Sequence, residues 1–263
     1  MGPASPQPTL QHLRKALAGI DPSLGPSLPE PEQIIGTGVP DIDAALGGGV
    51  PRGALHEISP PAPLHLAAAT GLAMAFTARA CGAKGQTLWI VTELALMEGG
   101  GPYGPGLDLF GLPSASVLVL RVSRAVDALW AMEEALRCRA LKSVIAELGD
   151  DTVADDLTAT RRLMLAAREG NCPGFFLRYR STEAPSAAAT RWTVSAAPSR
   201  PDFYGGLGRT RFELSLRKNR RGPCGRWIIE WDHHERIFQP AVSVAVAPAA
   251  LDRPDRAPSV RAG

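Results

Sequence analysis

The sequence predicts a doubly wound α/β fold whose mostly parallel central sheet continues into an antiparallel extension. Short apolar runs such as LWIV (88–91) and VLVL (117–120) alternate with longer helical patterns between residues 53 and 170. Continuous apolar strands separated by helices are what a parallel sheet covered on both faces requires. From about residue 174, strand-like pieces follow one another across short polar turns without a long helix between them. The absence of long helices here predicts an antiparallel or mixed extension of the sheet near the C-terminus.

The expected elements begin with a strand at GALHEIS (53–59) and a nearly all-apolar helix at 63–82 that ends near Gly82. The acidic run ELGDDTVADD (147–156) is expected to cap a helix that follows it, because carboxylates accept hydrogen bonds from the free N–H groups of a first turn. A further helix is expected at 125–141, with strands at 86–93, 116–122, 143–148, 174–180, 190–199, 210–220 and 225–232.

Length and composition predict one domain that carries terminal extensions. The chain has 263 residues, of which 45% are hydrophobic, and its net charge is only +2, so affinity for nucleic acid would have to come from a local patch. Four widely spaced cysteines argue against a disulfide scaffold and against a zinc site, and we expect no metal site. Because no run of about 18 apolar residues occurs, we expect a cytoplasmic protein without a membrane contact.

The two ends of the chain differ in amino-acid composition from the core, which we place at residues 35–239. Residues 1–34 hold a short amphipathic helix, with Leu10, Leu13 and Leu17 on one face, followed by a proline-rich linker. The helix is too short to be stable alone, so it must dock either on its own core or on a partner. Residues 240–263 are rich in Ala, Pro and Arg and are expected to form a mobile tail.

Two stretches of the core resemble RecA-type recombinases. GTGVPDIDAALGGGVPRGALHEI (36–58) is similar to the segment that precedes their phosphate loop, and LSLRKNRRGPCGRWIIEW (214–231) is similar to the hairpin that carries their Lys-Asn signature. The resemblance covers residues 35 to 232 and implies a RecA-like core. Within that superfamily, LGGGVPRGALHE (46–57) and LSLRKNRRG (214–222) resemble the ImuA family most.

Resemblance to the ImuA family implies a role in SOS-induced translesion DNA synthesis and mutagenesis. The partners that it implies are an ImuB-like Y-family polymerase homologue and an error-prone C-family polymerase. RecA, or a second copy of the chain, is a further partner that the resemblance allows, because an N-terminal helix docks on a neighbouring core in RecA-type filaments. In that arrangement Leu10, Leu13 and Leu17 would be contact residues.

The residues that bind phosphate and magnesium in the phosphate loop of a RecA-type core are replaced in this sequence. When Glu57-Ile58 is aligned with the Glu-Ile that precedes the loop in a RecA core, Pro60 takes the position of the first loop glycine. Leu66 then takes the position of the lysine and Ala67 that of the Ser/Thr. A phosphate loop needs backbone N–H groups, a lysine and a hydroxyl that binds magnesium. Pro60, Pro61 and Pro63 have no N–H to offer. We therefore expect no nucleotide cofactor and no catalytic residue.

Two acidic residues lie where the resemblance expects acids. Glu93, in LWIVTEL (88–94), comes after a strand, as a catalytic glutamate would, and Glu147, in SVIAELGD (143–150), lies at the end of another strand, as a Walker B acid would. They could form a vestigial site for metal and water. Solvated carboxylates at strand ends are the favoured interpretation, because the phosphate half of the site has been lost.

A basic cluster surrounds the turn of the hairpin predicted near residue 220: Arg217, Lys218, Arg220 and Arg221. Such a cluster can neutralise several phosphates of single-stranded DNA without reading its sequence. The same charges could instead protect a solvated edge strand from aggregation, and both interpretations stay open. Nearby aromatic residues could stack on bases, although aromatics in strands more often pack the core: Trp192, Tyr204 and Trp227.

The sequence thus favours a non-catalytic RecA-like adaptor that helps to assemble a translesion polymerase complex. One alternative is a DNA-dependent ATPase in which Lys84 or Arg79 serves an altered phosphate site. The other is an inhibitor of the division protein FtsZ that resembles SulA.

Overall fold

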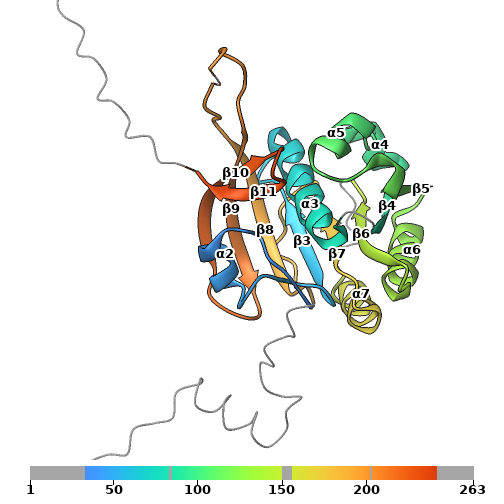
Figure 1. The fold of residues 1–263 in the computed structure, drawn as a ribbon. Coiled ribbons are helices and arrows are strands. Elements are labelled where there is room, and N and C mark those ends of the chain that lie inside the picture. The colour runs from blue at the N-terminus through green and yellow to red at the C-terminus, as the bar shows by residue number, and fades with distance from the viewer. Residues whose placement is uncertain (1–32, 83–84, 150–155, 202, 242–263) are drawn as a thin grey trace, which may run out of the picture.

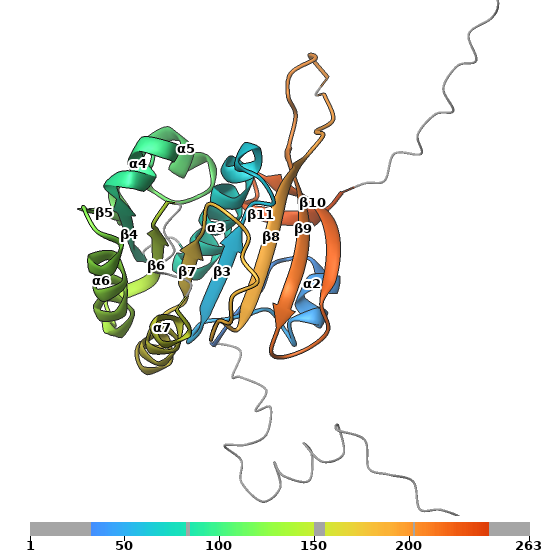
Figure 2. The same cartoon turned by 180° about the vertical axis from the view of Figure 1, so that it is seen from behind.

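A nine-stranded sheet with helices on both faces forms the core of the molecule (Figures 1 and 2). The computed structural model describes residues 33–82, 85–149, 156–201 and 203–241. The strand order is β11-β10-β9-β8-β3-β7-β6-β4-β5, in which the strands from β8 to β5 are parallel to one another. Strands β9, β10 and β11 continue the sheet with antiparallel pairing. This architecture confirms the predicted fold class.

The helices and strands follow the order expected from the sequence, with short additions before β3, between β3 and α3, between β4 and β5, and after β10. Their bounds are β1 Ile34–Ile35, α2 Pro40–Ala45, β2 Val50–Pro51, β3 Leu55–Ser59, η2 Pro63–His65, α3 Leu66–Cys81, β4 Gln86–Thr92, α4 Glu93–Gly99, α5 Gly104–Leu109, η3 Ser114–Ser116, β5 Val117–Val122, α6 Ala125–Arg137, β6 Leu141–Glu147, α7 Leu157–Gly170, β7 Gly174–Leu177, β8 Thr190–Ala197, β9 Thr210–Asn219, β10 Gly225–Asp232 and β11 Ile237–Pro240.

Helix α3 is enclosed by the sheet, which curls so that distant strands reach the same side chain. The Phe76 ring lies 6.0 Å from the ring of Phe175 on β7, 5.9 Å from Trp192 on β8 and 5.9 Å from Phe238 on β11. The segment Pro63–Cys81 is long and apolar enough to cross a membrane by length and composition alone. Its packing against strands on three sides is that of a core helix, and this burial explains its apolar composition.

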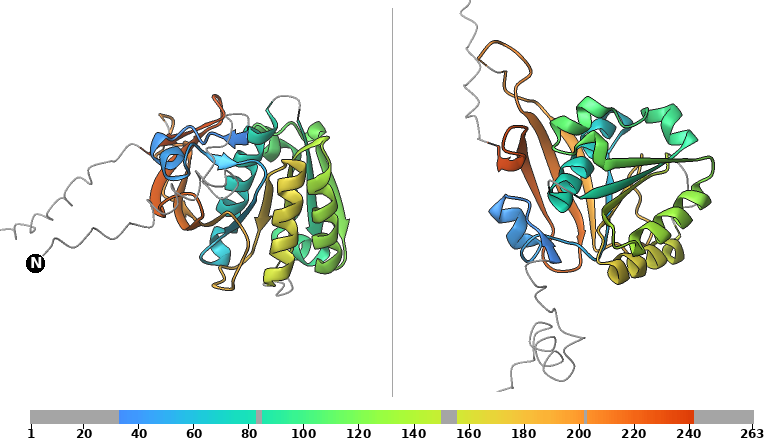
Figure 3. Two further views of the ribbon diagram at one scale, coloured as in Figure 1. Left: turned by 90° about the horizontal axis from the view of Figure 1, so that it is seen from below. Right: turned by 45° about the vertical axis from the view of Figure 1, so that its right-hand side comes forward.

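The opposite face of the sheet is covered by α6 and α7, which lie side by side (Figure 3). Their apolar faces form a second core with residues of β3, β4, β6 and β7. Gly170 permits the close approach, because a Cβ at this position would lie 1.9 Å from the carbonyl oxygen of Leu136 at the end of α6. Asp156 caps α7 by accepting a hydrogen bond of 2.8 Å from the N–H of Thr158, as the acidic run predicted.

Strand β5 departs from the expectation that every parallel strand is covered on both faces. Among the strands of the described residues its neighbour is β4 alone, and Leu118 and Leu120 are 56% and 37% exposed. The two leucines pair with Leu88 and Ile90 of β4, which pack against α6, so all four side chains point to the α6 face. Continuous hydrophobicity therefore does not distinguish a central strand from an edge strand.

Several predicted features lie outside the described residues. These are the helix that carries Leu10, Leu13 and Leu17, its proline-rich linker up to residue 32, and the tail from residue 242 onward. The predictions for the two termini therefore remain predictions.

A buried polar chain ties β8, β3 and β2 together. The Trp192 indole donates to Thr190 Oγ1 at 2.9 Å, and the Thr190 hydroxyl lies 2.8 Å from His56 Nδ1. The second ring nitrogen of His56, Nε2, lies 2.9 Å from the carbonyl oxygen of Pro51. A neutral imidazole satisfies all of these contacts if Nε2 carries the proton. Burial lowers the pKa of His56 from 6.5 to about 4.

His56 gives the first prediction, a loss of stability in mild acid. The unfolded chain binds a proton at this residue below about pH 6.5, whereas the folded protein does so only below about pH 4. Stability present at pH 7 is therefore lost as the pH falls between these values, by up to about 3 kcal/mol. Urea unfolding of wild type and His56→Gln across this range measures the effect. An NMR titration in which the His56 ring protonates near pH 6.5 would contradict it.

Candidate functional site

The turn between β3 and α3 occupies the place of a phosphate loop, at the carboxyl end of a central strand. Pro60 is buried, whereas Pro61 and Pro63 are exposed, and η2 fills the space before α3 begins at Leu66. The three prolines themselves have no N–H to offer, whereas the His65 N–H donates to the carbonyl oxygen of Ala62 within the turn. Ala67, at the magnesium-binding position, is exposed and has no hydroxyl.

Side chains of the protein itself pack around this turn. The Nδ1 atom of His65 accepts a hydrogen bond of 3.2 Å from the N–H of Ala196 on β8, which anchors the turn to the sheet. Leu66 packs against the core that surrounds α3. A Cβ added at Gly99 would lie 3.2 Å from Leu66 and 2.3 Å from the Tyr179 hydroxyl, so both side chains meet the end of α4. The leucine at the lysine position thus has a packing role.

Glu147, the predicted Walker B acid, is a buried hydrogen-bond acceptor. Its Oε1 accepts from the Tyr179 hydroxyl at 2.7 Å and its Oε2 accepts from the Trp89 indole at 3.0 Å. Burial raises the pKa of Glu147, and the hydrogen bonds from Tyr179 and Trp89 oppose that rise. The favoured interpretation of a solvated carboxylate was wrong for this residue, which is 4% exposed. Tyr179 and Trp89 could not be recognised as its partners from the sequence.

Glu93, the second acid, fits the solvated interpretation. It is exposed at the first position of α4, where it accepts a hydrogen bond of 3.1 Å from the hydroxyl of Ser123. Strands β4 and β6 are neighbours, so both acids lie at the same edge of the sheet. Within the described residues, no cluster of three or more His, Cys, Asp or Glu side chains could hold a metal ion.

Arg79, a candidate cation for an altered phosphate site, lies at the wrong end of α3. Thirteen residues separate it from Leu66 along the helix, a distance of about 20 Å. Its guanidinium donates to the carbonyl oxygens of Gly36 and Arg236. Lys84, the other candidate, lies outside the described residues.

A buried ion cluster fixes the loop between β7 and β8 beside the turn. Glu57, on β3, accepts from the Ser186 hydroxyl at 2.6 Å, from Arg191 Nε at 2.7 Å and from Arg178 Nη2 at 3.2 Å. Arg191 also donates to the carbonyl oxygens of Thr182 and Ala184. Glu57, the middle residue of β3, therefore holds this loop against the sheet, a role that its position in the sequence motif did not indicate.

The four cations of the predicted basic cluster divide into two pairs. Lys218 Nζ donates to the carbonyl oxygen of Ser186, and Arg221 Nη2 donates to the carbonyl oxygen of Gly47 at 2.7 Å. Arg217 and Arg220 are exposed. Their strand β9 lies between β8 and β10, so the alternative of a solvated edge strand was wrong. Half of the cluster therefore clamps the hairpin to the core and half faces solvent.

The three aromatic candidates do not surround this hairpin turn. Trp192 is fully buried, and Trp227 packs against it with ring centroids 6.3 Å apart. Tyr204 is 92% exposed but lies in the β8–β9 loop, at the opposite end of β9. A ten-residue strand separates the two ends by roughly 30 Å, so Tyr204 does not lie beside the cations.

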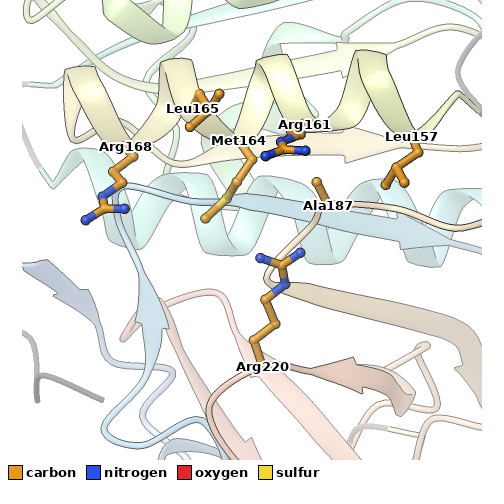
Figure 4. A pocket seen from close by; sticks show the side chains of 7 residues that line it. All are labelled: Leu157, Arg161, Met164, Leu165, Arg168, Ala187 and Arg220. Carbon is orange, nitrogen blue, oxygen red and sulfur yellow. The ribbon is translucent and has the colours of Figure 1, made fainter. Parts of the chain in front are cut away.

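A groove of about 410 Å³ lies between α7 and the β9–β10 turn (Figure 4). The Arg220 side chain extends across it toward α7, where Arg161 and Arg168 lie on the same helix face. The remaining lining is apolar: Leu157, Met164, Leu165 and Ala187. Sequence reasoning missed the α7 arginines, although their seven-residue spacing would have shown a shared helix face.

Comparison with known proteins identifies the family. Protein ImuA of Caulobacter vibrioides, in each of two strains, is 30% identical over 220 residues that cover 76% of this chain and 84% of the relative. The chain belongs to the ImuA family. No model of a known protein family matches the sequence.

A solved structure supports the fold of this ImuA-family protein. The crystal structure of the RadB recombinase matches it with a TM-score of 0.56 over 80% of this chain and 100% of the RadB chain. The sequence identity is 16%, so the likeness concerns the fold, which is RecA-like. The predicted family and fold class are both confirmed.

Burial of Glu147 gives the second prediction. Because the pKa of Glu147 is raised in the folded protein, this carboxyl group loses its proton in the unfolded chain at a lower pH, near 4.5. Between that pH and the folded-state pKa, ionisation favours the unfolded chain, so the wild type loses stability as the pH rises. Glu147→Gln cannot ionise, and its stability relative to wild type should increase over this range in urea unfolding. The exposed Glu93→Gln is the matched control, with a change within about 0.5 kcal/mol. A constant difference between Glu147→Gln and wild type at every pH would contradict the prediction.

Proposed function

We propose that this ImuA-family protein is a non-catalytic RecA-like adaptor in SOS-induced translesion DNA synthesis and mutagenesis. Its proposed partners are an ImuB-like Y-family polymerase homologue and an error-prone C-family polymerase, with RecA or a second copy as further partners. The observation that carries the proposal is the turn between β3 and α3, where Leu66 packs in the core and His65 bonds to β8.

The acids beside the turn support the same proposal. A RecA-type ATPase needs an accessible carboxylate to hold magnesium and a second to position water. Here Glu147 is enclosed by Trp89 and Tyr179, and its raised pKa disfavours the charged form that a metal would need. Freeing Glu147 would leave buried polar groups without partners, at a cost of about 1–3 kcal/mol each.

Exposed apolar residues give the protein a surface for partners. Val126 and Trp130, on α6, are 48% and 64% exposed, and they lie one helical turn apart. Together with Leu118 and Leu120 they place apolar side chains at the β5 edge of the sheet. Exposed apolar patches of this kind mark protein interaction sites. An unpaired strand edge also offers backbone groups to an added strand.

Direct contact with single-stranded DNA is a secondary part of the proposal. Arg217 and Arg220 are the members of the basic cluster that face solvent, and they could neutralise backbone phosphates. Lys218 and Arg221, which bind backbone carbonyls of the core, would hold the hairpin in place.

Nucleotide titration gives the third prediction. Calorimetry with magnesium and ATP should show no binding by the wild type at micromolar nucleotide. Leu66→Lys combined with Ala67→Thr should not create binding, because Pro60, Pro61 and Pro63 still provide no N–H groups for phosphate. Magnesium-dependent ATP binding by the wild type with micromolar affinity would overturn the non-catalytic assignment and favour the ATPase alternative.

Overexpression separates the adaptor from an inhibitor of the SulA type. An inhibitor of FtsZ would produce filamentous cells and leave mutation frequency unchanged. The adaptor proposal expects cells of normal length.

A further inference from the structure

The groove between α7 and the β9–β10 turn has positive charge along an apolar floor. Arg161 and Arg168 are two helical turns apart on α7, and Arg220 approaches from the hairpin (Figure 4). None of the lining residues is acidic. The groove therefore combines groups that bind anions with a floor that binds an apolar side chain.

The three arginines of the groove have no partners within the described part of the chain. Among the described residues, none forms a hydrogen bond or an ion pair with any of these three guanidinium groups. Arginines on the other side of α7 are paired: Arg162 of α7 binds Glu133 at 2.6 Å, and Arg137 of α6 binds the same carboxylate at 2.8 Å. Positive charge is thus compensated on the α6 side of α7 and left uncompensated on the groove side.

The walls of the groove are fixed by hydrogen bonds that do not involve the three guanidinium groups. The Arg220 N–H donates to the carbonyl oxygen of Ala189 at 3.0 Å, and the Asn219 amide donates to the carbonyl oxygen of Ala45 at 2.8 Å. On the other side, the Ala187 N–H donates to Thr160 Oγ1 of α7 at 3.0 Å. Preorganised walls lower the entropy cost of binding, because the ligand need not order them.

The lining favours a peptide over single-stranded DNA. Surfaces that hold single-stranded DNA present aromatic side chains on which bases stack, and no lining residue of this groove is aromatic. Aliphatic and methionine side chains instead suit an aliphatic or aromatic side chain of a protein partner. Arginine pairs with carboxylates through two parallel hydrogen bonds, which adds geometric specificity.

We infer that this groove binds an acidic peptide segment of a partner protein, with carboxylates on Arg161, Arg168 and Arg220 and one apolar side chain on the Met164 floor. The inference deepens the proposed adaptor function, on which its biological meaning rests, by naming the chemistry of one partner segment. Under this inference Arg220 binds a carboxylate of a partner protein and not a phosphate of single-stranded DNA.

Peptide binding to the purified full chain tests the inference and is our fourth prediction. The probe is a fluorescein-labelled peptide of about ten residues in which Asp and Glu flank a single Leu, followed by fluorescence anisotropy. We expect binding that weakens with added salt. Arg161→Glu combined with Arg168→Glu should weaken it about tenfold or more, because like charges then oppose the peptide. Arg139→Glu combined with Arg121→Glu changes the net charge equally at exposed sites outside the groove and should bind as wild type does.

A second variant tests the apolar floor separately from charge. Met164→Ala should weaken the Leu peptide several-fold and leave a peptide with Ala in place of Leu unchanged. Equal loss for both peptides, or equal loss in the two double charge variants, would overturn the inference. Binding of single-stranded oligo(dT) but not of the peptide would overturn it in favour of a DNA site. The peptide assay contains no nucleotide, so a negative result overturns the groove inference alone. The adaptor proposal is tested separately by the ATP titration.

Discussion

The rest of the structure depends on the enclosure of helix α3 by a sheet that curls around it. Phe76 contacts aromatic rings from β7, β8 and β11, so strands from the parallel half and from the antiparallel extension share one core. The helix can occupy that place only if β3 passes directly into it through a tight turn. That requirement is mechanical and does not involve a nucleotide. A proline-rich turn meets this requirement as well as a glycine-rich turn does. Proline restricts the backbone by itself, whereas a glycine-rich loop is ordered by the phosphate that it binds.

Polar groups at the carboxyl end of the sheet satisfy one another. Glu147 accepts hydrogen bonds from Trp89 and Tyr179, and Glu57 binds Ser186, Arg178 and Arg191. A buried carboxylate without partners would be strongly destabilising, so acids kept at these strand ends need donors in the absence of a ligand. These donors come from the loop after β7 and from a neighbouring strand. The same loop forms part of the groove beside α7 through Ala187, which places a stable scaffold behind the arginines.

Local patterns predicted the elements, whereas contacts between distant segments decided their roles. The change to antiparallel pairing comes after β8, because β7 and β8 both run parallel to β3. The apolar runs located β3, β4 and β6, because strand periodicity is a property of neighbouring residues. They could not show that β5 lies at the edge. The residue types at 60, 66 and 67 predict a turn without phosphate ligands, and the packing of Leu66 against the core was visible only in the fold. The division of the basic cluster could not be predicted, since Arg221 binds Gly47 across 174 positions of sequence. Arg161 and Arg168 share a face that their spacing reveals, but the approach of Arg220 depends on the fold.

The central claim is that function resides in surfaces and not in the former nucleotide turn. Its most direct test is the frequency of damage-induced mutation in cells whose own copy of the gene is deleted and replaced by variants expressed at equal, folded levels. The account predicts that Glu147→Gln restores induced mutation to about the wild-type frequency, whereas Arg161→Glu combined with Arg168→Glu leaves it near that of the deletion. Loss of induced mutation with Glu147→Gln, and full restoration by the double arginine variant, would contradict the account.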